Sequence, residues 1–196
     1  MNLVTLSGSP SAKSRSAWLL RLAQERLPAA HDTEAHIDVR GLPAQALLRA
    51  DAKHPELSHA IGQVTQADLL IVSTPIYKAA YSGLLKVFLD LLPPDVLRGK
   101  AVLPLATGGS PGHLLAIDYA LKPVLASLGA RHILDTVYVL DEHLRPHETL
   151  GYVPDDSVIE RLDRALQGVS QAAVRRRTVP SALPSTVSTL VARFSG

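Results

Sequence analysis

Residues 68–73 read DLLIVS, a nearly uninterrupted apolar run of strand length. A strand that is apolar along its whole length suits a parallel sheet covered on both faces, because crossover helices pack on each side. Four further strand-length segments lie at residues 2–7, 35–39, 100–106 and 132–140. The run at 68–73 therefore predicts the third of five parallel strands.

Segments with helical periodicity separate these strands, so that strands and helices alternate along the chain. They cover residues 16–27, 56–66, 82–92, 113–128 and 155–174. This alternation predicts a three-layer α/β sandwich in which right-handed crossovers place helices on both faces of the sheet. Five strands favour the flavodoxin-like order 2-1-3-4-5 over the six-stranded dinucleotide-binding fold.

The chain has 196 residues, a length that suits one domain with one core. We predict a flavodoxin-like domain over residues 1–177. Residues 178–196 are rich in Pro, Ser and Thr, which predicts a C-terminal tail that is mobile or ordered only against a partner subunit. A longer connection over residues 41–54 is expected to cover part of a ligand.

Composition excludes several classes of function. The net charge is +2, but without Arg175, Arg176, Arg177 and Arg193 only 16 basic residues face 18 acidic ones. The body of the chain therefore lacks the broad basic face that nucleic-acid binding needs. The absence of cysteine excludes disulfides, thiol catalysis and thiolate metal ligands. With no signal-peptide pattern after Met1 and no apolar stretch of the ~18 residues that span a membrane, we expect a soluble, cytoplasmic protein without membrane or nucleic-acid partners.

The loop after the first strand, residues 7–16 (SGSPSAKSRS), combines five serines with a glycine and two cations. Hydroxyls, backbone N–H groups and a helix N-terminus together form a phosphate site, to which Arg15 adds a charge-assisted contact. An equally plain interpretation is a serine-rich loop in which Ser14 or Ser16 only caps the helix. Neither a Walker pattern nor G-x-G-x-x-G is present, which disfavours a nucleoside triphosphate or a Rossmann-bound dinucleotide.

Two further loops are expected at the same edge of the sheet, because the strand order reverses between the first and third strands. Residues 74–83 (TPIYKAAYSG) place Tyr77 and Tyr81 either near this crevice or packed beneath the loop. Residues 107–113 (TGGSPGH) hold three glycines, which give room for a flat ring or simply a flexible connection. With the first loop, they predict a mononucleotide with a large flat base.

At these residues the chain resembles the NAD(P)H-dependent FMN reductase family, especially the branch that supplies reduced flavin to alkanesulfonate monooxygenases. The matching stretches are residues 8–16 (GSPSAKSRS), 67–93 (ADLLIVSTPIYKAAYSGLLKVFLDLLP) and 99–125 (GKAVLPLATGGSPGHLLAIDYALKPVL). The resemblance covers most of residues 1–140. The first loop of the wider family often reads G-S-x-R-x-x-S, whereas here no arginine stands at that position and Arg15 comes later.

This resemblance implies FMN and NADPH, or NADH, as the bound nucleotides. It also implies a hydride step that requires no side-chain acid or base, so we assign no catalytic residue. The residues that it assigns to the flavin phosphate are Ser9, Ser14, Arg15 and Ser16. Those that it assigns to the flavin ring are Pro75, Ile76, Tyr77, Thr107, Gly108 and Gly109.

The helix over residues 113–128 contains a proline in its interior. Pro123 has no N–H to donate to the carbonyl of Tyr119, so the helix must kink or widen there. In the similar reductases, an inserted tyrosine at this position makes a π-bulge at a subunit interface near the flavin; an ordinary proline kink is the alternative. The helix also carries more apolar surface than one sheet face needs, which predicts a homodimer or homotetramer.

Three functions stay open at this point. We favour an NAD(P)H:FMN oxidoreductase that transfers hydride from nicotinamide to flavin N5. It would supply reduced FMN to a two-component flavin-dependent monooxygenase that removes sulfonate groups. The second is a quinone, azo-dye or metal-ion reductase that keeps FMN tightly bound. The third is a flavodoxin-type electron carrier, which the weak acidity of the body disfavours. We expect no metal site, because Pro146 lies between His143 and His147, the one pair with suitable helical spacing.

Overall fold

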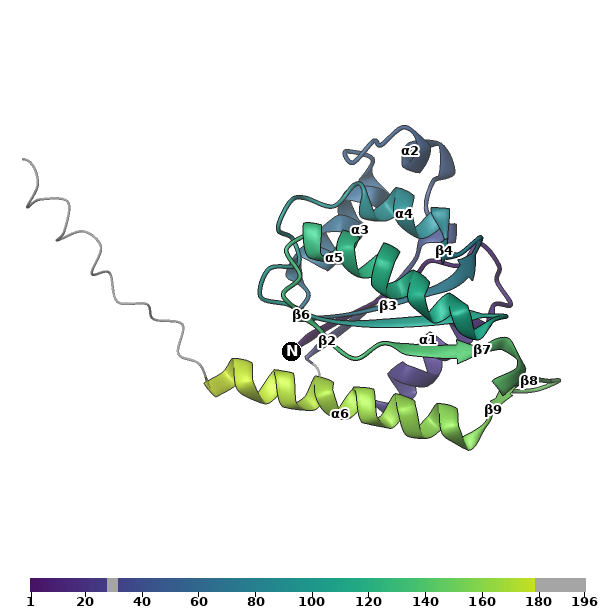
Figure 1. Ribbon diagram of the computed structural model, residues 1–196. Helices are drawn as coiled ribbons and strands as arrows, with labels where there is room; N and C mark the ends of the chain where they lie inside the picture. The colour runs from purple at the N-terminus through teal and green to yellow at the C-terminus, as the bar shows by residue number, and fades with distance from the viewer. Residues whose placement is uncertain (28–31, 179–196) are drawn as a thin grey trace, which may run out of the picture.

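The computed structural model describes residues 1–27 and 32–178, apart from the side chains of residues 170–178. A mainly parallel sheet forms the middle layer (Figure 1). Its strands lie in the order β2 (Thr33–Asp38), β1 (Asn2–Ser7), β3 (Leu69–Tyr77), β5 (Ala101–Gly108) and β6 (His132–Ile133). This path follows the predicted order, and the α/β class with a parallel central sheet is confirmed.

The predicted count of five strands is wrong, because the sheet contains seven strands among the described residues. The last predicted strand is split: β6 ends at Ile133, and β7 (Val137–Leu140) then pairs with a later part of β5. The additional β4 (Ala80–Tyr81) folds back antiparallel on the end of β3. The two residues of the connecting turn, Lys78 and Ala79, have φ angles of 49° and 61°, the left-handed conformation that such tight turns require.

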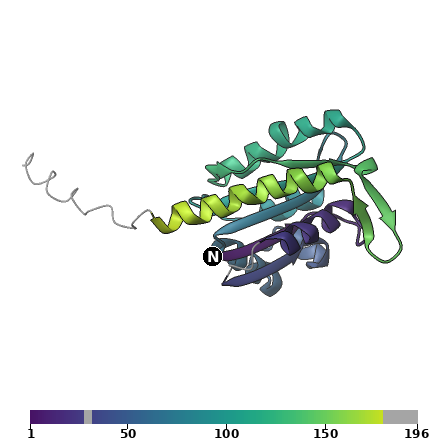
Figure 2. The ribbon, with the colours of Figure 1, turned by 90° about the horizontal axis from the view of Figure 1, so that it is seen from below.

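Helices cover both faces of the sheet. Figures 1 and 2 show α3 (Pro55–Gln66), α4 (Gly83–Leu89) and α5 (Lys122–Ser127) on one face, and α1 (Arg15–Arg26) and α6 (Asp156–Thr178) on the other. Successive side chains of a strand point to opposite faces, which divides the core into two clusters. In β3, Leu70 and Val72 join the first cluster, whereas Leu69 and Ile71 join the second. The unbroken apolar run at 68–73 is thus explained by burial on both faces.

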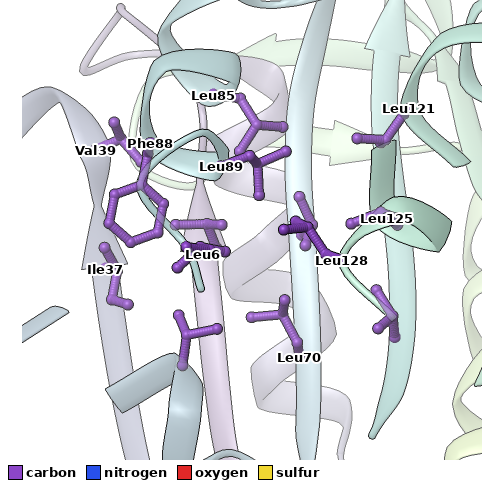
Figure 3. Packing of buried hydrophobic residues seen from close by; sticks show 14 of the residues in the cluster. Leu6, Ile37, Val39, Leu70, Leu85, Phe88, Leu89, Leu121, Leu125 and Leu128 are labelled. Atoms are coloured by element: carbon purple, nitrogen blue, oxygen red, sulfur yellow. The ribbon is translucent and has the colours of Figure 1, made fainter. Parts of the chain in front are cut away.

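The first cluster contains an aromatic ring. Phe88 of α4 is fully buried and lies among Leu6, Ile37 and Val39 from the neighbouring part of the sheet (Figure 3). The α4 helix begins after Ser82, whose hydroxyl accepts a hydrogen bond from the N–H of Leu85 at 3.1 Å. This cap holds the helix in the register that directs Phe88 inward.

The predicted helix over residues 113–128 consists of three consecutive parts. A 3₁₀ turn, η2 (Pro111–Leu114), leads into a π-helical segment, η3 (Ile117–Leu121), which continues as α5. The π-helical segment contains Tyr119 and lies just before Pro123, where the missing N–H removes one α-helical hydrogen bond.

The connections also contain structure that the sequence did not predict. The expected long connection over residues 41–54 contains the end of a short 3₁₀ turn, η1 (Val39–Gly41), and a helix, α2 (Ala44–Leu48). After β7, the chain makes a 3₁₀ turn, η4 (Asp141–His143), and then a hairpin of β8 (Leu144–His147) and β9 (Gly151–Pro154). Residues 179–196 of the predicted tail lie outside the described residues, so the domain boundary stays a prediction.

Within the described part of the chain, no helix combines the length and apolarity needed to cross a bilayer.

The packing around Phe88 predicts its contribution to stability. Phe88→Ala leaves a cavity between α4 and the sheet and should lower the free energy of unfolding by about 3–5 kcal/mol. Phe88→Leu keeps most of the volume and should cost less than about 2 kcal/mol. Urea unfolding followed by circular dichroism measures both changes. Equal stability of the two variants would contradict the placement of this ring.

Candidate functional site

The loops after β1 and β3 are joined by hydrogen bonds at the carboxyl edge of the sheet. The backbone N–H of Gly8 donates to the carbonyl of Ser73 at 2.8 Å, and the hydroxyl of Ser82 donates to the carbonyl of Gly8. The hydroxyl of Ser73 donates in turn to the carbonyl of Ser16 at 2.7 Å. Because all of these groups are buried, each bond satisfies a polar atom that water cannot reach.

Gly8 is required at this junction for steric reasons. A Cβ atom on Gly8 would lie 2.6 Å from Cβ of Leu85, a contact that neither the loop nor α4 can accommodate without moving. The first loop therefore rests directly on the start of α4, and the rest of the loop extends outward from this contact.

The predicted phosphate residues lie together in the first loop, but they differ in what they already bind. Ser14 caps α1, since its hydroxyl accepts from the N–H of Ala17 at 3.0 Å, and it lies 3.1 Å from the hydroxyl of Ser16. Ser9 is buried, and its hydroxyl accepts from the N–H of Ser11 at 3.2 Å. The simple capping interpretation is thus correct for Ser14, while a phosphate role for the same loop stays a prediction.

Arg15 of this loop carries a buried donor without a hydrogen-bond partner. Its Nε is buried and has no hydrogen-bond partner within residues 1–27 and 32–178. The nearest carboxylate oxygen, Oδ1 of Asp141, lies 3.9 Å from Nε, too far for a hydrogen bond. The guanidinium carbon lies 5.3 Å from the ring centroid of Tyr152. An unsatisfied guanidinium donor in a serine-rich loop fits an anion such as a phosphate.

The loops after β3 and β5 lie side by side. Pro75 and Thr107 are paired residues in the parallel ladder, and both are buried. A Cβ atom on Gly108 would lie 3.4 Å from Cβ of Ile76, so the backbone at Gly108 passes close to the end of β3. Tyr77, at the end of β3, is 51% exposed and is not packed beneath its loop.

A tyrosine from β7 supports the loop after β5. The hydroxyl of Tyr138 donates to the carbonyl of Ser110 at 2.6 Å, and burial raises the pKa of this tyrosine. Tyr138 therefore stays protonated at neutral pH and keeps its proton for this bond. Gly109 is exposed at the same edge. A Cβ atom added to Gly109 would lie 3.9 Å from Oδ2 of Asp141. The structure thus brings the loops after β1, β3 and β5 to one edge, as the sequence predicted.

Comparison with known proteins decides the family. The model of the NADPH-dependent FMN reductase family matches residues 1–144. The chain belongs to the NADPH-dependent FMN reductase family. The predicted NAD(P)H:FMN oxidoreductase activity and the two nucleotides, FMN and NADPH or NADH, are thereby confirmed.

Individual members of the FMN reductase family are similar over most of the chain. An "FMN reductase (NADPH)" of Escherichia coli (strain K12) is 48% identical, covering 90% of this chain and 92% of its own. A Pseudomonas putida "NADH-dependent FMN reductase SfnF" is 33% identical over 87% of this chain and 91% of its own. The apo crystal structure of the NADH:FMN oxidoreductase EMOB is 42% identical with a TM-score of 0.77, covering 92% of this chain and 91% of that one.

Several residues at this edge of the sheet carry no signal in the sequence. Asp141, Tyr138 and Tyr152 come from segments after the third loop, and only the fold brings them to the site. His143 lies on the 3₁₀ segment η4 and His147 on β8, so they do not share an α-helix, and His147 accepts hydrogen bonds from the turn of its own hairpin. The described residues contain no group of three metal-ligating side chains.

The contact at Gly8 gives a matched pair of glycine substitutions. Gly8→Ala forces Cβ into Leu85 and should lower the free energy of unfolding by about 1–3 kcal/mol. Gly83→Ala is the control, because no heavy atom lies within 4 Å of its Cβ position at the start of the same helix. This control should be neutral or stabilising by up to about 1 kcal/mol. Urea unfolding of both variants tests the contact, and equal stabilities would refute it.

Proposed function

We propose that the chain is a flavin reductase that treats FMN as a substrate and delivers reduced FMN to a two-component flavin-dependent monooxygenase, in a sulfonate-degrading system. The relatives at 48% and 33% identity are named as reductases of FMN, names in which FMN is the molecule that is reduced. The resemblance of the long central stretches to the sulfonate branch supports the choice of partner. The use of a nicotinamide nucleotide supports a cytoplasmic location.

The observation that carries FMN binding is the unsatisfied Nε of Arg15. A buried guanidinium donor without a partner is costly, and a phosphate oxygen satisfies it with a charge-assisted bond. Ser9 and Ser16 belong to the same loop, and both are buried. The side chain of Arg15 as a whole is 34% exposed although its Nε is buried, so a phosphate would approach the exposed part of the guanidinium and reach Nε after a shift of the side chain. Such an open anchor suits a nucleotide that enters and leaves in each cycle.

The remaining assigned residues would hold the flat ring. Pro75, Ile76 and Tyr77 lie along one side of the edge, and Thr107, Gly108 and Gly109 lie along the next strand. When bound, FMN supplies a hydride acceptor, and the nicotinamide supplies the hydride. The protein's task is to orient the two rings and exclude water, and exposed backbone amides near Gly109 would stabilise negative charge.

The assignment of Arg15 to the FMN phosphate predicts different FMN affinities for two arginine variants. Arg15→Ala should raise the dissociation constant for FMN by roughly ten- to a hundredfold, because it removes a hydrogen bond to a charged group. Arg21→Ala, an exposed arginine later in α1, is the control and should leave that constant unchanged. Quenching of flavin fluorescence measures both. Identical constants for the two variants would contradict the phosphate assignment.

The function itself is tested by anaerobic mixing of the protein with FMN and either NADPH or NADH. Bleaching of the flavin absorption band is expected, with catalytic turnover when FMN is in excess. Steady-state kinetics with each nucleotide identifies the preferred donor. Flavin that stays with the protein through dialysis, together with rapid turnover of quinones, would favour the alternative of a reductase with tightly bound FMN.

We also propose that the η2–η3 surface mediates self-association as a homodimer or homotetramer. Leu114, Leu115 and Tyr119 are exposed there, and Tyr119 is 79% exposed although it is a large aromatic residue. An apolar surface that meets its own copy across a twofold axis explains this exposure.

If this surface forms the interface, replacing Tyr119 should change the assembly of the protein. Tyr119→Ala should shift the protein toward smaller species at a given concentration, because it removes the largest exposed ring of this surface. Leu48→Ala, an exposed residue of α2, is the control and should leave assembly unchanged. Sedimentation velocity with and without FMN measures the species. A wild-type protein that is monomeric at every concentration would exclude the interface.

A further inference from the structure

The β8–β9 hairpin lies beside the first loop of the site, although it comes much later in the chain. It follows β7 and extends next to α1 (Figures 1 and 2). Its base is anchored, because Leu144 is fully buried in the cluster beneath α1 and α6 and the N–H of Asp155 donates to the carbonyl of His143 at 3.0 Å. Residues 145–151, by contrast, are exposed.

Two hydrogen bonds tie this hairpin to α1 and the loop before it. The indole N–H of Trp18 donates to the carbonyl of Leu150 at 2.8 Å, and the hydroxyl of Tyr152 donates to the carbonyl of Lys13 at 3.2 Å. The two rings meet edge to face, with centroids 5.9 Å apart and an interplanar angle of 71°. Gly151, with φ of 77°, brings the backbone against Trp18: a Cβ there would lie 3.2 Å from the indole.

The ring of Tyr152 also supports Arg15. The guanidinium carbon of Arg15 lies 5.3 Å from the ring centroid, within the range of a cation–π contact. Asp141 faces the same guanidinium at 3.9 Å from Nε. Neither neighbour accepts the proton of Nε, so the side chain is oriented while this donor stays unsatisfied.

We propose that Tyr152 is a positioning residue that holds Arg15 and the backbone at Lys13 ready for the phosphate of FMN, so that the β8–β9 hairpin makes the enzyme selective for FMN over riboflavin. This inference rests on the proposed phosphate site and deepens it. A long arginine side chain otherwise loses conformational freedom when it binds, and holding it in place beforehand removes that cost. FMN and riboflavin share the ring and the ribityl chain, so weaker positioning of Arg15 changes the affinity for FMN alone.

The test compares two substitutions at Tyr152. Tyr152→Leu removes both the ring beneath Arg15 and the hydroxyl, whereas Tyr152→Phe removes only the bond to Lys13. Dissociation constants for FMN and for riboflavin are measured by quenching of flavin fluorescence, and urea unfolding establishes that each variant is folded. Leu150→Ala is the control, because it trims an exposed side chain and keeps the carbonyl that accepts from Trp18.

Selective loss of FMN affinity is the expected result. Tyr152→Leu should weaken FMN binding by roughly five- to twentyfold, with riboflavin binding changed by less than about twofold. Tyr152→Phe should weaken FMN binding by about two- to fivefold, again without an effect on riboflavin. In an Arg15→Ala background, Tyr152→Leu should have almost no further effect on FMN, because the two residues act through one contact.

Other outcomes overturn the proposal. Equal weakening of FMN and riboflavin would show that Tyr152 only stabilises the fold near the ring. Full additivity with Arg15→Ala would show that the two side chains act independently. Unchanged FMN affinity in both Tyr152 variants would remove the role altogether. Failure of the wild-type protein to bind FMN would instead refute the proposed function on which the inference rests.

Discussion

The close approach of the Gly8 backbone to Leu85 is the contact on which the arrangement of the site depends. Because Gly8 has no side chain, the end of β1 rests directly on the first turn of α4. The N–H of Gly8 then donates to the carbonyl of Ser73 in β3, and its carbonyl accepts from the hydroxyl of Ser82, the residue that caps α4. One steric constraint thus fixes two of the three loops relative to each other, and the ladder between Pro75 and Thr107 fixes the third.

This frame is built from backbone contacts and buried hydroxyls, which suits the chemistry of the family. Hydride transfer between two planar rings needs orientation more than it needs an acid or a base. The polar side chains at the edge are accordingly committed to structure: Ser14 caps α1, Ser73 and Ser82 bond to backbone carbonyls, and Tyr138 supports Ser110. Arg15 and His113 differ, since the Nε of Arg15 and the Nδ1 of His113 are buried without a hydrogen-bond partner among the described residues.

The order of the parallel strands and the three loops were predictable from the sequence, because apolar periodicity over five to fifteen residues is a local property. Features that depend on backbone detail were harder to predict. The left-handed turn at Lys78 and Ala79 uses neither Asn nor Gly, so β4 had no turn signal. The last strand was predicted as continuous, although its pairing with β5 is interrupted after Ile133. Pro123, in contrast, is a local signal, and the sequence indicated a distortion where the π-helical segment lies.

By itself, the sequence determined the α/β alternation, the parallel sheet and the position of a serine-rich loop with Arg15 at the start of α1. The physical reason is that burial patterns, caps and prolines act on neighbouring residues. Only the tertiary structure decided what surrounds Arg15. Tyr152 bonds to a carbonyl 139 positions earlier in the chain, and Asp141 approaches from the end of β7. Contacts at such separations arise from the packing of the whole sheet and leave no periodic trace in the amino-acid sequence.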